Sequence, residues 1–296
     1  MDPTTLLQFS SQNLKACTSN FNENNLIGLT QFGRLFRGNL EGQRVLVKIW
    51  DREKLEWISS KYNDEYLIMK ARGSKVLDKS NIGRLPQLGD LDWLYLGDRY
   101  SLNWVQITNV IHELAKLLNF IHDQKQNMVL NISASHTLLD KDYKPQLFDL
   151  LLLGEVKMLK EELTMSTSYI DPYFSIKGGE WDRSSEVFSL GIVMLQLITK
   201  RISGIRKRKD GNLNLDSLMH IWAKNEYKPN CSLVHKTLKE DWCYCAEDGV
   251  AITLLAMQCI EFFPANRPSM RDVLHSLDNL SVLQRLPDAR PTKREK

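Results

Sequence analysis

Two ionisable residues near the amino-terminal end have the pattern of a buried ion pair. Lys48 lies in the segment 44–50 (RVLVKIW), where apolar residues occupy both alternating sets of positions, so a strand here would be buried on both faces. Glu65 lies beside Tyr62 on the apolar stripe of a predicted helix over 56–73. A buried ammonium is costly unless it is paired, so we expect Lys48 to bind Glu65. The alternative is that both side chains extend to water.

A third ionisable residue, Asp149, follows a predicted short hairpin within the stretch 129–155 (VLNISASHTLLDKDYKPQLFDLLLLGE). A carboxylate in this place could hold Mg²⁺, which prefers oxygen ligands. The polar residues before it are poor catalytic groups: the amide of Asn131 cannot act as a base, and the neutral imidazole of His136 is a poor Mg²⁺ ligand. The stretch therefore offers a possible metal ligand without an evident catalytic partner.

The composition limits the class of protein. With 296 residues, 43% of them hydrophobic, the chain can bury one large core or two adjoining lobes. The net charge of +3 is too mild to indicate nucleic acid or a membrane surface. The two most basic segments, 206–209 and the tail 290–296, are expected to be solvated, with electrostatic docking of a partner as the alternative.

The cysteines and the apolar segments give no sign of secretion or of a metal site. The five cysteines are scattered, and the C-x-C of Cys243 and Cys245 has no second ligand pair. We expect reduced thiols in a cytoplasmic protein, which partners could recruit to the plasma membrane. The first residues lack a signal-peptide pattern and the second is not the glycine that myristoylation needs. The apolar run 187–198 is too short to cross a bilayer and predicts a buried helix, so no direct membrane insertion is expected.

The chain divides into two parts of different pattern. Residues 24–50 alternate apolar and polar positions, break at glycines and turn at 39–43, which predicts strands. After about residue 100 the pattern is helical, with an apolar face in 107–122, and Pro268 fits a first helical turn. We predict an α+β fold with a strand-rich part followed by a helical part, the further helices covering 187–198, 215–224, 247–259 and 269–280.

From about residue 9 to 282 the sequence resembles a protein kinase domain, in particular the plant receptor-like cytoplasmic kinases. The matching motifs occur in the family's order: IGLTQFGRLFRG, VLVKIW, NDEYLIM, SLNW, SYIDPYF, SSEVFSLGIVMLQLITKR and CIEFFPANRPSMRDVLHSL. The resemblance implies a bilobal fold with a small β-rich N-lobe and a larger helical C-lobe. The implied parts are a lead-in 1–23, an N-lobe 24–99, a C-lobe 100–282 and a basic tail 283–296.

The resemblance assigns vestigial nucleotide-binding positions to Gly28, Gly33, Lys48, Glu65 and Asp149. The middle glycine of the family's phosphate-binding loop is a threonine here, whose Cβ crowds the approach of a phosphate. The pair of lysine and glutamate could equally be a structural tie with no nucleotide present. The segment between Glu65 and the C-lobe is also shorter than in the family. Either the adenine cleft is reduced or an exon fragment is missing, and we expect no cofactor, with weak binding of ATP and magnesium as the alternative.

The family's catalytic loop reads H-R-D-x-K-x-x-N, and five of its positions are changed in this chain. Val129, Leu130 and Asn131 stand for the histidine, the arginine and the catalytic aspartate. Ser133 replaces the lysine that steadies the transferring phosphate, and His136 replaces the metal-binding asparagine. Loss of a general base alone lowers a rate by about 10² to 10⁴. Losing base, lysine and ligand together is more serious.

Three further positions depart from the family. Leu151 replaces the glycine of the D-F-G triplet, and Tyr173 replaces the glutamate that pairs with an arginine, here Arg267. Arg267 is therefore expected to lack its usual partner. Glu186 replaces the aspartate that ties down the catalytic-loop backbone, which is a milder change.

Together these departures indicate a pseudokinase, a kinase fold without catalysis or a catalytic metal. The resemblance extends to pseudokinase adaptors of plant immunity, which implies protein partners: a nucleotide-binding leucine-rich-repeat receptor, a receptor-like cytoplasmic kinase and a pathogen effector. A weak or atypical ATP-binding kinase and an allosteric activator of a true kinase are the alternatives. Four aromatic residues could anchor a partner or belong to the C-lobe core: Trp222, Tyr227, Trp242 and Tyr244.

Overall fold

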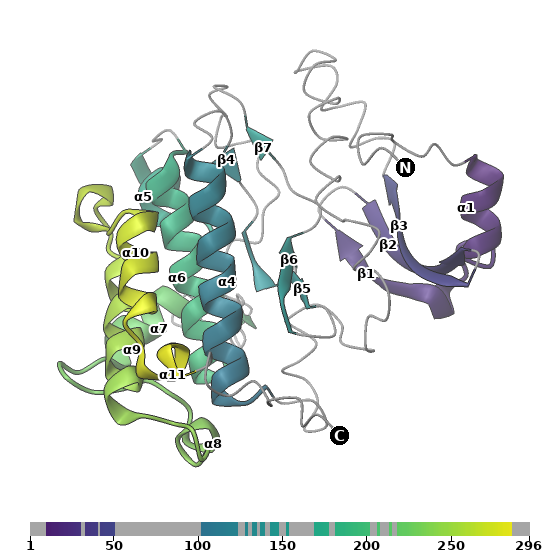
Figure 1. Cartoon of the computed structure of the whole chain (residues 1–296). Helices are drawn as coiled ribbons and strands as arrows, with labels where there is room; N and C mark the ends of the chain where they lie inside the picture. Colours follow the sequence, from purple (N-terminus) through teal and green to yellow (C-terminus); the bar gives the residue numbers. More distant parts are fainter. Residues whose placement is uncertain are drawn as a thin grey trace, which may run out of the picture. The chain divides into compact units, whose positions relative to one another are not determined.

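The computed structural model divides the chain into two compact units, residues 1–87 and 88–296, each of which is described by itself (Figure 1). The predicted boundary near residue 99 and the predicted helix 56–73 lie outside the described residues. The structure describes residues 10–30, 33–40, 42–50, 102–123, 128–129, 132–134, 137–139, 143–147, 152–153, 169–177, 181–201, 206–207, 213–214 and 218–285.

The first unit contains a three-stranded antiparallel sheet in the order β1-β2-β3. Its strands are β1 (Leu26–Thr30), β2 (Gly33–Leu40) and β3 (Gln43–Trp50). A short helix α1 (Ser11–Cys17) and the 3-10 turn η1 (Glu23–Asn25) precede them. A Cβ added at Gly38 would lie 2.9 Å from the carbonyl oxygen of Cys17, so the glycine allows α1 to pack closely on β2. The strands predicted over residues 24–50 are present.

The second unit is mainly helical. Its helices are α4 (Trp104–Asp123), α5 (Pro172–Lys177), α6 (Arg183–Thr199), α7 (Met219–Glu226), α8 (Lys236–Lys239), α9 (Ala246–Cys259), the 3-10 turn η8 (Pro264–Asn266), α10 (Met270–Asp278) and α11 (Ser281–Gln284). The short strands pair as β4 (Met128–Val129) with β7 (Leu152–Leu153), β5 (Thr137–Leu139) with β6 (Pro145–Leu147), and β8 (Arg206–Lys207) with β9 (Leu213–Asn214).

The helices α4, α6, α9 and α10 occupy the segments in which helical periodicity was predicted. One detail was wrong: Pro268 precedes the N-cap residue Ser269 and is not in the first turn of α10. Ser269 and Asp272 form a capping box instead, in which each side chain bonds the other residue's backbone N–H. The helix therefore begins after the N-cap residue Ser269, and Pro268 lies just before this cap.

Helix α6 forms the centre of the second unit. Every residue from Ser185 to Thr199 is buried, and the helix packs against α4, α7 and α9. This agrees with the prediction of a buried helix over 187–198. A Cβ on Gly191 would lie 2.7 Å from the Cβ of Cys259, so the glycine allows α6 and α9 to approach closely. In Figure 1 α6 lies between α4 and α9.

The four aromatic residues that could anchor a partner or belong to the core differ in burial. Trp222, Tyr227 and Tyr244 are partly buried against the core, whereas Trp242 is 93% exposed. The neighbouring Asp241 accepts a hydrogen bond from the backbone N–H of Trp104 at 2.8 Å, so the segment that carries Trp242 is tied to the start of α4. Trp242 is thus displayed on a fixed segment.

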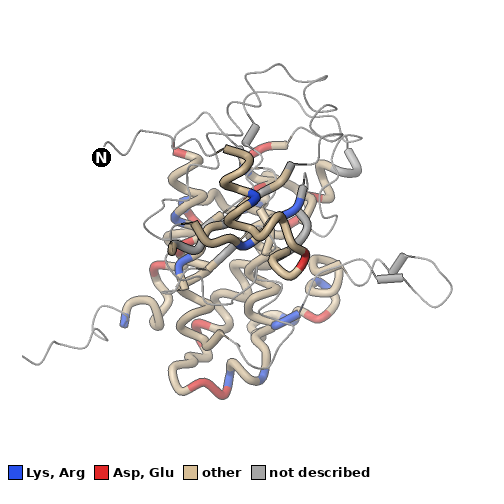
Figure 2. Tube along the Cα trace, turned by 90° about the vertical axis from the view of Figure 1, so that its right-hand side faces the viewer, with Lys and Arg blue, Asp and Glu red and all other residues tan. Residues whose placement is uncertain are grey.

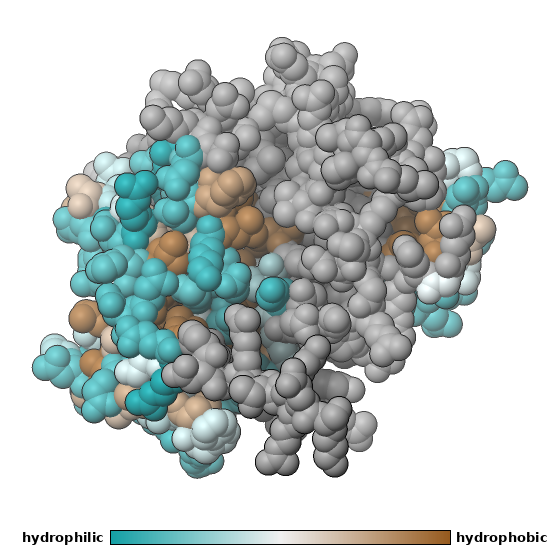
Figure 3. Space-filling view, in the orientation of Figure 1, coloured by the Kyte–Doolittle hydropathy of each residue, from teal (hydrophilic) through white to brown (hydrophobic). Residues whose placement is uncertain are grey.

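The described surface has a mixed polarity. Lysines and arginines are interspersed with acidic residues along the described chain (Figure 2), and the helical face seen in Figure 3 is mostly hydrophilic with small hydrophobic patches. All five cysteine thiols are free. Among the described helices, none has both the length and the apolar character needed to cross a bilayer.

Candidate functional site

The segment that the resemblance assigns to the catalytic loop starts at β4 and is deeply buried where it is described. Val129, Ile132, Ser133 and Ala134 are each at most 3% exposed. Ser133, at the position of the family's lysine, therefore has a neutral hydroxyl within the interior. Leu130, Asn131 and His136 lie outside the described residues, so their predicted roles remain predictions.

Glu186 on α6 holds the start of this segment. One carboxylate oxygen, Oε1, accepts a hydrogen bond from the Val129 backbone N–H at 2.6 Å, and Oε2 bonds Nε2 of His122 at the end of α4. Burial raises the pKa of the Glu186 carboxyl, while its bond to His122 acts in the opposite direction. The glutamate therefore ties the loop backbone to two helices, as the resemblance implied for this position.

A second support comes from Tyr169, which lies just before α5. Its hydroxyl donates to Oε1 of Gln196 on α6 at 2.6 Å and accepts from the Ala134 backbone N–H at 3.4 Å. The hydroxyl of Ser189 donates to the Tyr169 carbonyl oxygen at 3.0 Å. The polar residues of α6 thus hold the loop and the segment that begins at residue 169 in one fixed arrangement.

A buried ion pair between Arg267 and Asp171 fixes the segment that follows Tyr169. The two guanidinium nitrogens donate to the two carboxylate oxygens at 2.6 and 2.7 Å, and the two side chains are 0% and 1% exposed. Carbonyl oxygens of Ser184, Glu261 and Phe262 accept the remaining bonds. The result is a bidentate charge pair whose donors are all directed at acceptors.

This pair corrects the expectation that Arg267 lacks a partner. The carboxylate comes from a position two residues before Tyr173, where the family's glutamate was expected. Tyr173 instead packs edge-on against Phe262 and Phe263, with ring centres 5.8 and 6.4 Å apart. Sequence reasoning missed Asp171, although this acidic residue in the motif SYIDPYF was a signal for it.

The vestigial nucleotide-binding positions of the first unit lie in one sheet. Gly28 pairs with Leu35 from one side of β2 and Lys48 pairs with Leu35 from the other, so the three residues form one row across the strands. Gly33 begins β2 opposite Thr30. The predicted partner Glu65 lies outside the described residues, and the pairing of Lys48 with it stays a prediction.

The described residues hold no cluster of three or more His, Cys, Asp or Glu side chains that could bind a metal ion. The predicted metal ligand Asp149 and the degenerate position Leu151 lie outside the described part of the chain. The described site consists of buried polar and charged side chains around a loop, and these side chains bond other groups of the protein.

Comparison with known proteins gives distant relatives along nearly the whole chain. The chain is 22% identical to the cysteine-rich receptor-like protein kinase 18 of Arabidopsis thaliana, over 96% of this chain and 46% of the relative. It is 24% identical to the cysteine-rich receptor-like protein kinase 45 of the same plant, over 92% of this chain and 81% of the relative. No protein-family model matches. The chain spans about half the length of most of the curated relatives it matches. These relatives support a kinase-related protein of the plant receptor-like kinase type, with a kinase-like fold.

Proposed function

We propose that the chain is a catalytically inactive kinase-like protein that acts as a protein-binding adaptor. The observation that supports this most is the contrast between the supports of the loop and the loop itself. Glu186 and Tyr169 bond the loop backbone at Val129 and Ala134, and the pair Asp171–Arg267 fixes the segment that begins at residue 169. The loop itself carries Val129 and Ser133 where the family has a histidine and a lysine. Such a chain keeps the shape of a kinase lobe and lacks its catalytic groups.

The chemistry of phosphoryl transfer explains why these changes matter. The enzyme must position the two substrates and stabilise charge on the transferring group, with metal ions, a lysine and a base. By residue type, Asn131 offers no base, Ser133 offers no positive charge and His136 is a poor ligand for Mg²⁺. One such change could be compensated, but three in one loop remove most of the charge stabilisation together.

The finer form of the proposal concerns the partners. On the resemblance to pseudokinase adaptors, the protein bridges a nucleotide-binding leucine-rich-repeat immune receptor and a receptor-like cytoplasmic kinase or a pathogen effector. It would act in the cytoplasm and reach the plasma membrane through its partners. The exposed Trp242 is a suitable anchor, because large aromatic residues dominate the energy of many protein interfaces.

Thermal unfolding with and without ATP and Mg²⁺ tests whether the chain binds the nucleotide, which phosphoryl transfer requires. A ligand at a hundredfold excess over its Kd stabilises the native state by about 2.7 kcal/mol, which is easily detected. We expect no Mg²⁺-dependent shift at millimolar ATP. A shift that Asp149→Ala abolishes would mean that the cleft still binds the nucleotide, and would favour the weak kinase.

Affinity capture from plant extract tests the adaptor role, with the chain and its Lys48→Ala variant as baits. We expect both baits to retain the same receptor and kinase, since an adaptor does not need the phosphate-binding lysine. Loss of the partners with Lys48→Ala would count against a purely structural role. An increase in the captured kinase's turnover on adding the chain would identify an allosteric activator instead.

A further inference from the structure

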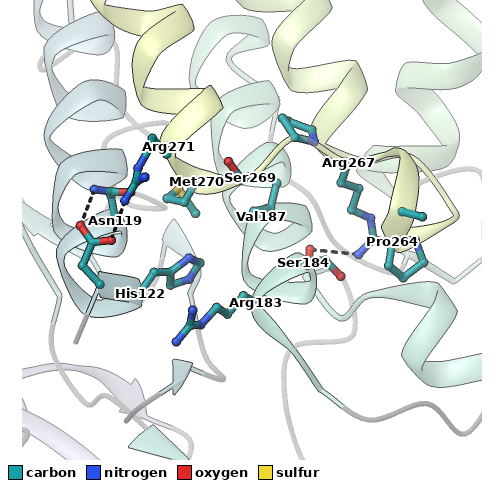
Figure 4. Close-up of a pocket in the computed structure, with 13 residues that line it drawn as sticks. Asn119, His122, Arg183, Ser184, Val187, Pro264, Arg267, Ser269, Met270 and Arg271 are labelled. Carbon is teal, nitrogen blue, oxygen red and sulfur yellow. Dashed lines mark hydrogen bonds and ion pairs between the residues drawn. The ribbon is translucent and has the colours of Figure 1, made fainter. Parts of the chain in front are cut away.

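A pocket of about 500 Å³ lies in the second unit, and His122, the partner of Glu186, is among the residues that line it. It is enclosed by the end of α4, the start of α6, and the chain from η8 into α10 (Figure 4). Its lining combines apolar groups, among them Val187, Pro264 and Met270, with the basic residues Arg183 and Arg271. A cavity with an apolar wall and converging charged groups is the usual form of a ligand site.

The two arginines are available to a ligand to different degrees. Arg183 is exposed, and its positive charge acts through space on the Glu186 carboxyl, whose pKa it lowers. Within the part of the chain that the structure describes, its guanidinium makes no hydrogen bond or ion pair. Arg271 bonds Asp123 at 3.3 Å, with the two side chains 79% and 51% exposed. Such an exposed pair contributes little and exchanges readily. In Figure 4, His122 is drawn between Arg183 and Arg271, so both border the same side of the pocket.

The other charged and polar groups of the pocket are already used. Arg267 is bound to Asp171. The backbone N–H groups at the start of α6 are capped by Asp182, and those of α10 by Ser269. Asp182 accepts from the N–H groups of Ser184 and Ser185, and Ser269 accepts from that of Asp272. The two guanidinium groups therefore carry the full positive charges that the pocket can offer to an anion.

The weak pairing of Arg271 with Asp123 indicates which anion fits. A carboxylate from a ligand would only replace the carboxylate of Asp123, with little gain. A phosphoryl group carries close to two charges and three acceptor oxygens, so it can displace Asp123 from Arg271, and the charge of Arg183 on the same side of the pocket favours it further. The apolar wall suits an adjacent hydrophobic side chain.

We propose that this pocket binds a phosphorylated side chain of a partner protein, next to a hydrophobic residue. The inference rests on the proposed adaptor function and names the chemistry of one partner. Because the positive charges come from outside the degenerate loop, this binding needs neither a nucleotide nor a metal ion.

Calorimetric titration with short peptides tests the proposal directly. The probe is acetyl-Ala-Leu-phosphoserine-Leu-Ala-amide, and the same peptide with serine or with aspartate in the centre gives the comparison. We expect only the phosphorylated peptide to bind well, with Kd weakened about fivefold or more by Arg183→Gln or Arg271→Gln. Asp123→Asn removes the internal competitor and is expected to tighten binding by about threefold. Arg285→Gln removes one charge from an exposed arginine that does not line the pocket, and leaves Kd unchanged.

Several outcomes would overturn the proposal. They are equal affinity in the wild type and Arg183→Gln, an aspartate peptide that binds as tightly as the phosphorylated one, and inorganic phosphate that binds as tightly as the peptide. The last result would indicate a site for the free ion. Thermal unfolding of each variant in the absence of peptide excludes loss of fold as the cause of weak binding.

The two proposals can fail separately. Capture of a receptor and kinase without binding of the phosphorylated peptide would remove the pocket inference and leave the adaptor role. Binding of the peptide without any captured partner would remove the adaptor role and leave a pocket that binds phosphorylated peptides.

Discussion

Replacing Asp171 with asparagine would leave the guanidinium of Arg267 buried without a counter-charge. The two side chains are 0% and 1% exposed, so water cannot take the place of the lost carboxylate. An amide at this position could accept one hydrogen bond but would turn its NH₂ group toward the guanidinium. Breaking one partner of a buried pair costs about 3–5 kcal/mol.

That loss should be visible as a large fall in the melting temperature. For domains of this size each kcal/mol corresponds to about 2–4 °C, so Asp171→Asn should melt roughly 6–20 °C below the wild type. Circular dichroism and tryptophan fluorescence can follow the transition. The matched control is Glu113→Gln, which removes a carboxylate from the exposed pair with Lys116 and should cost less than about 1 kcal/mol.

A second variant separates the charge from its position. Adding Tyr173→Glu to Asp171→Asn places an acid where the kinase family has one, and we expect it to recover part of the lost stability. If Asp171→Asn melts no lower than Glu113→Gln, the buried pair does not hold the segment that begins at residue 169 in place.

Four further results are expected. Burial, assisted by the positive charge of Lys224, lowers the pKa of His220 from 6.5 to about 4. Between pH 6.5 and pH 4, the unfolded chain therefore binds a proton at His220 and the folded chain does not. Stability should therefore fall on acidification, by about 2 kcal/mol at pH 5 in urea titrations, and His220→Gln should flatten that dependence. Glu186→Ala leaves the buried Val129 N–H without its acceptor, which should lower the free energy of unfolding by about 1–3 kcal/mol and speed amide hydrogen exchange at Val129. Unchanged exchange would mean that Glu186 does not hold the backbone at Val129. Trp242→Ala should change the free energy of unfolding by no more than about 0.5 kcal/mol while weakening capture of partners, and a large fall in stability would show that the side chain is structural. Gly191→Ala should cost about 1–3 kcal/mol in thermal unfolding, and a neutral result would mean that α6 and α9 can separate slightly without strain.

The helices of the second unit could be predicted because their periodicity reflects how they are buried. Ile107, Ile111, Leu114 and Leu118 recur on one face of α4 and all are buried there. Helix α6 is apolar on all sides, and the structure buries it on all sides. In both helices, the apolar residues that give the sequence its helical pattern are the residues that the fold buries.

The supports of the loop were less accessible from the sequence. Arg267 and Asp171 are 96 positions apart, and no local pattern connects residues so distant along the chain. Alignment with the kinase motif puts the acidic partner of Arg267 at position 173, where this chain has a tyrosine. The acid that binds Arg267 lies two positions earlier, at 171. The same limit applied to His122, whose bond to Glu186 joins residues 64 positions apart.

The four candidate anchor residues show another limit. Trp222 and Trp242 are the same residue type in similarly polar surroundings, yet one packs on the core and the other is exposed. The difference depends on which side of each segment faces the core, and only the fold determines that.

The close packing of α6 on α9 also determines how the Cys259 thiol reacts. Burial raises its pKa to about 12, so at neutral pH it is neither ionised nor accessible to a reagent. The other four cysteines are partly or fully exposed. An alkylating reagent would therefore modify the outer thiols of the folded protein first and reach Cys259 only when the two helices separate. The rate at which Cys259 is alkylated therefore measures how often α9 separates from α6, the helix whose side chains hold the loop in place.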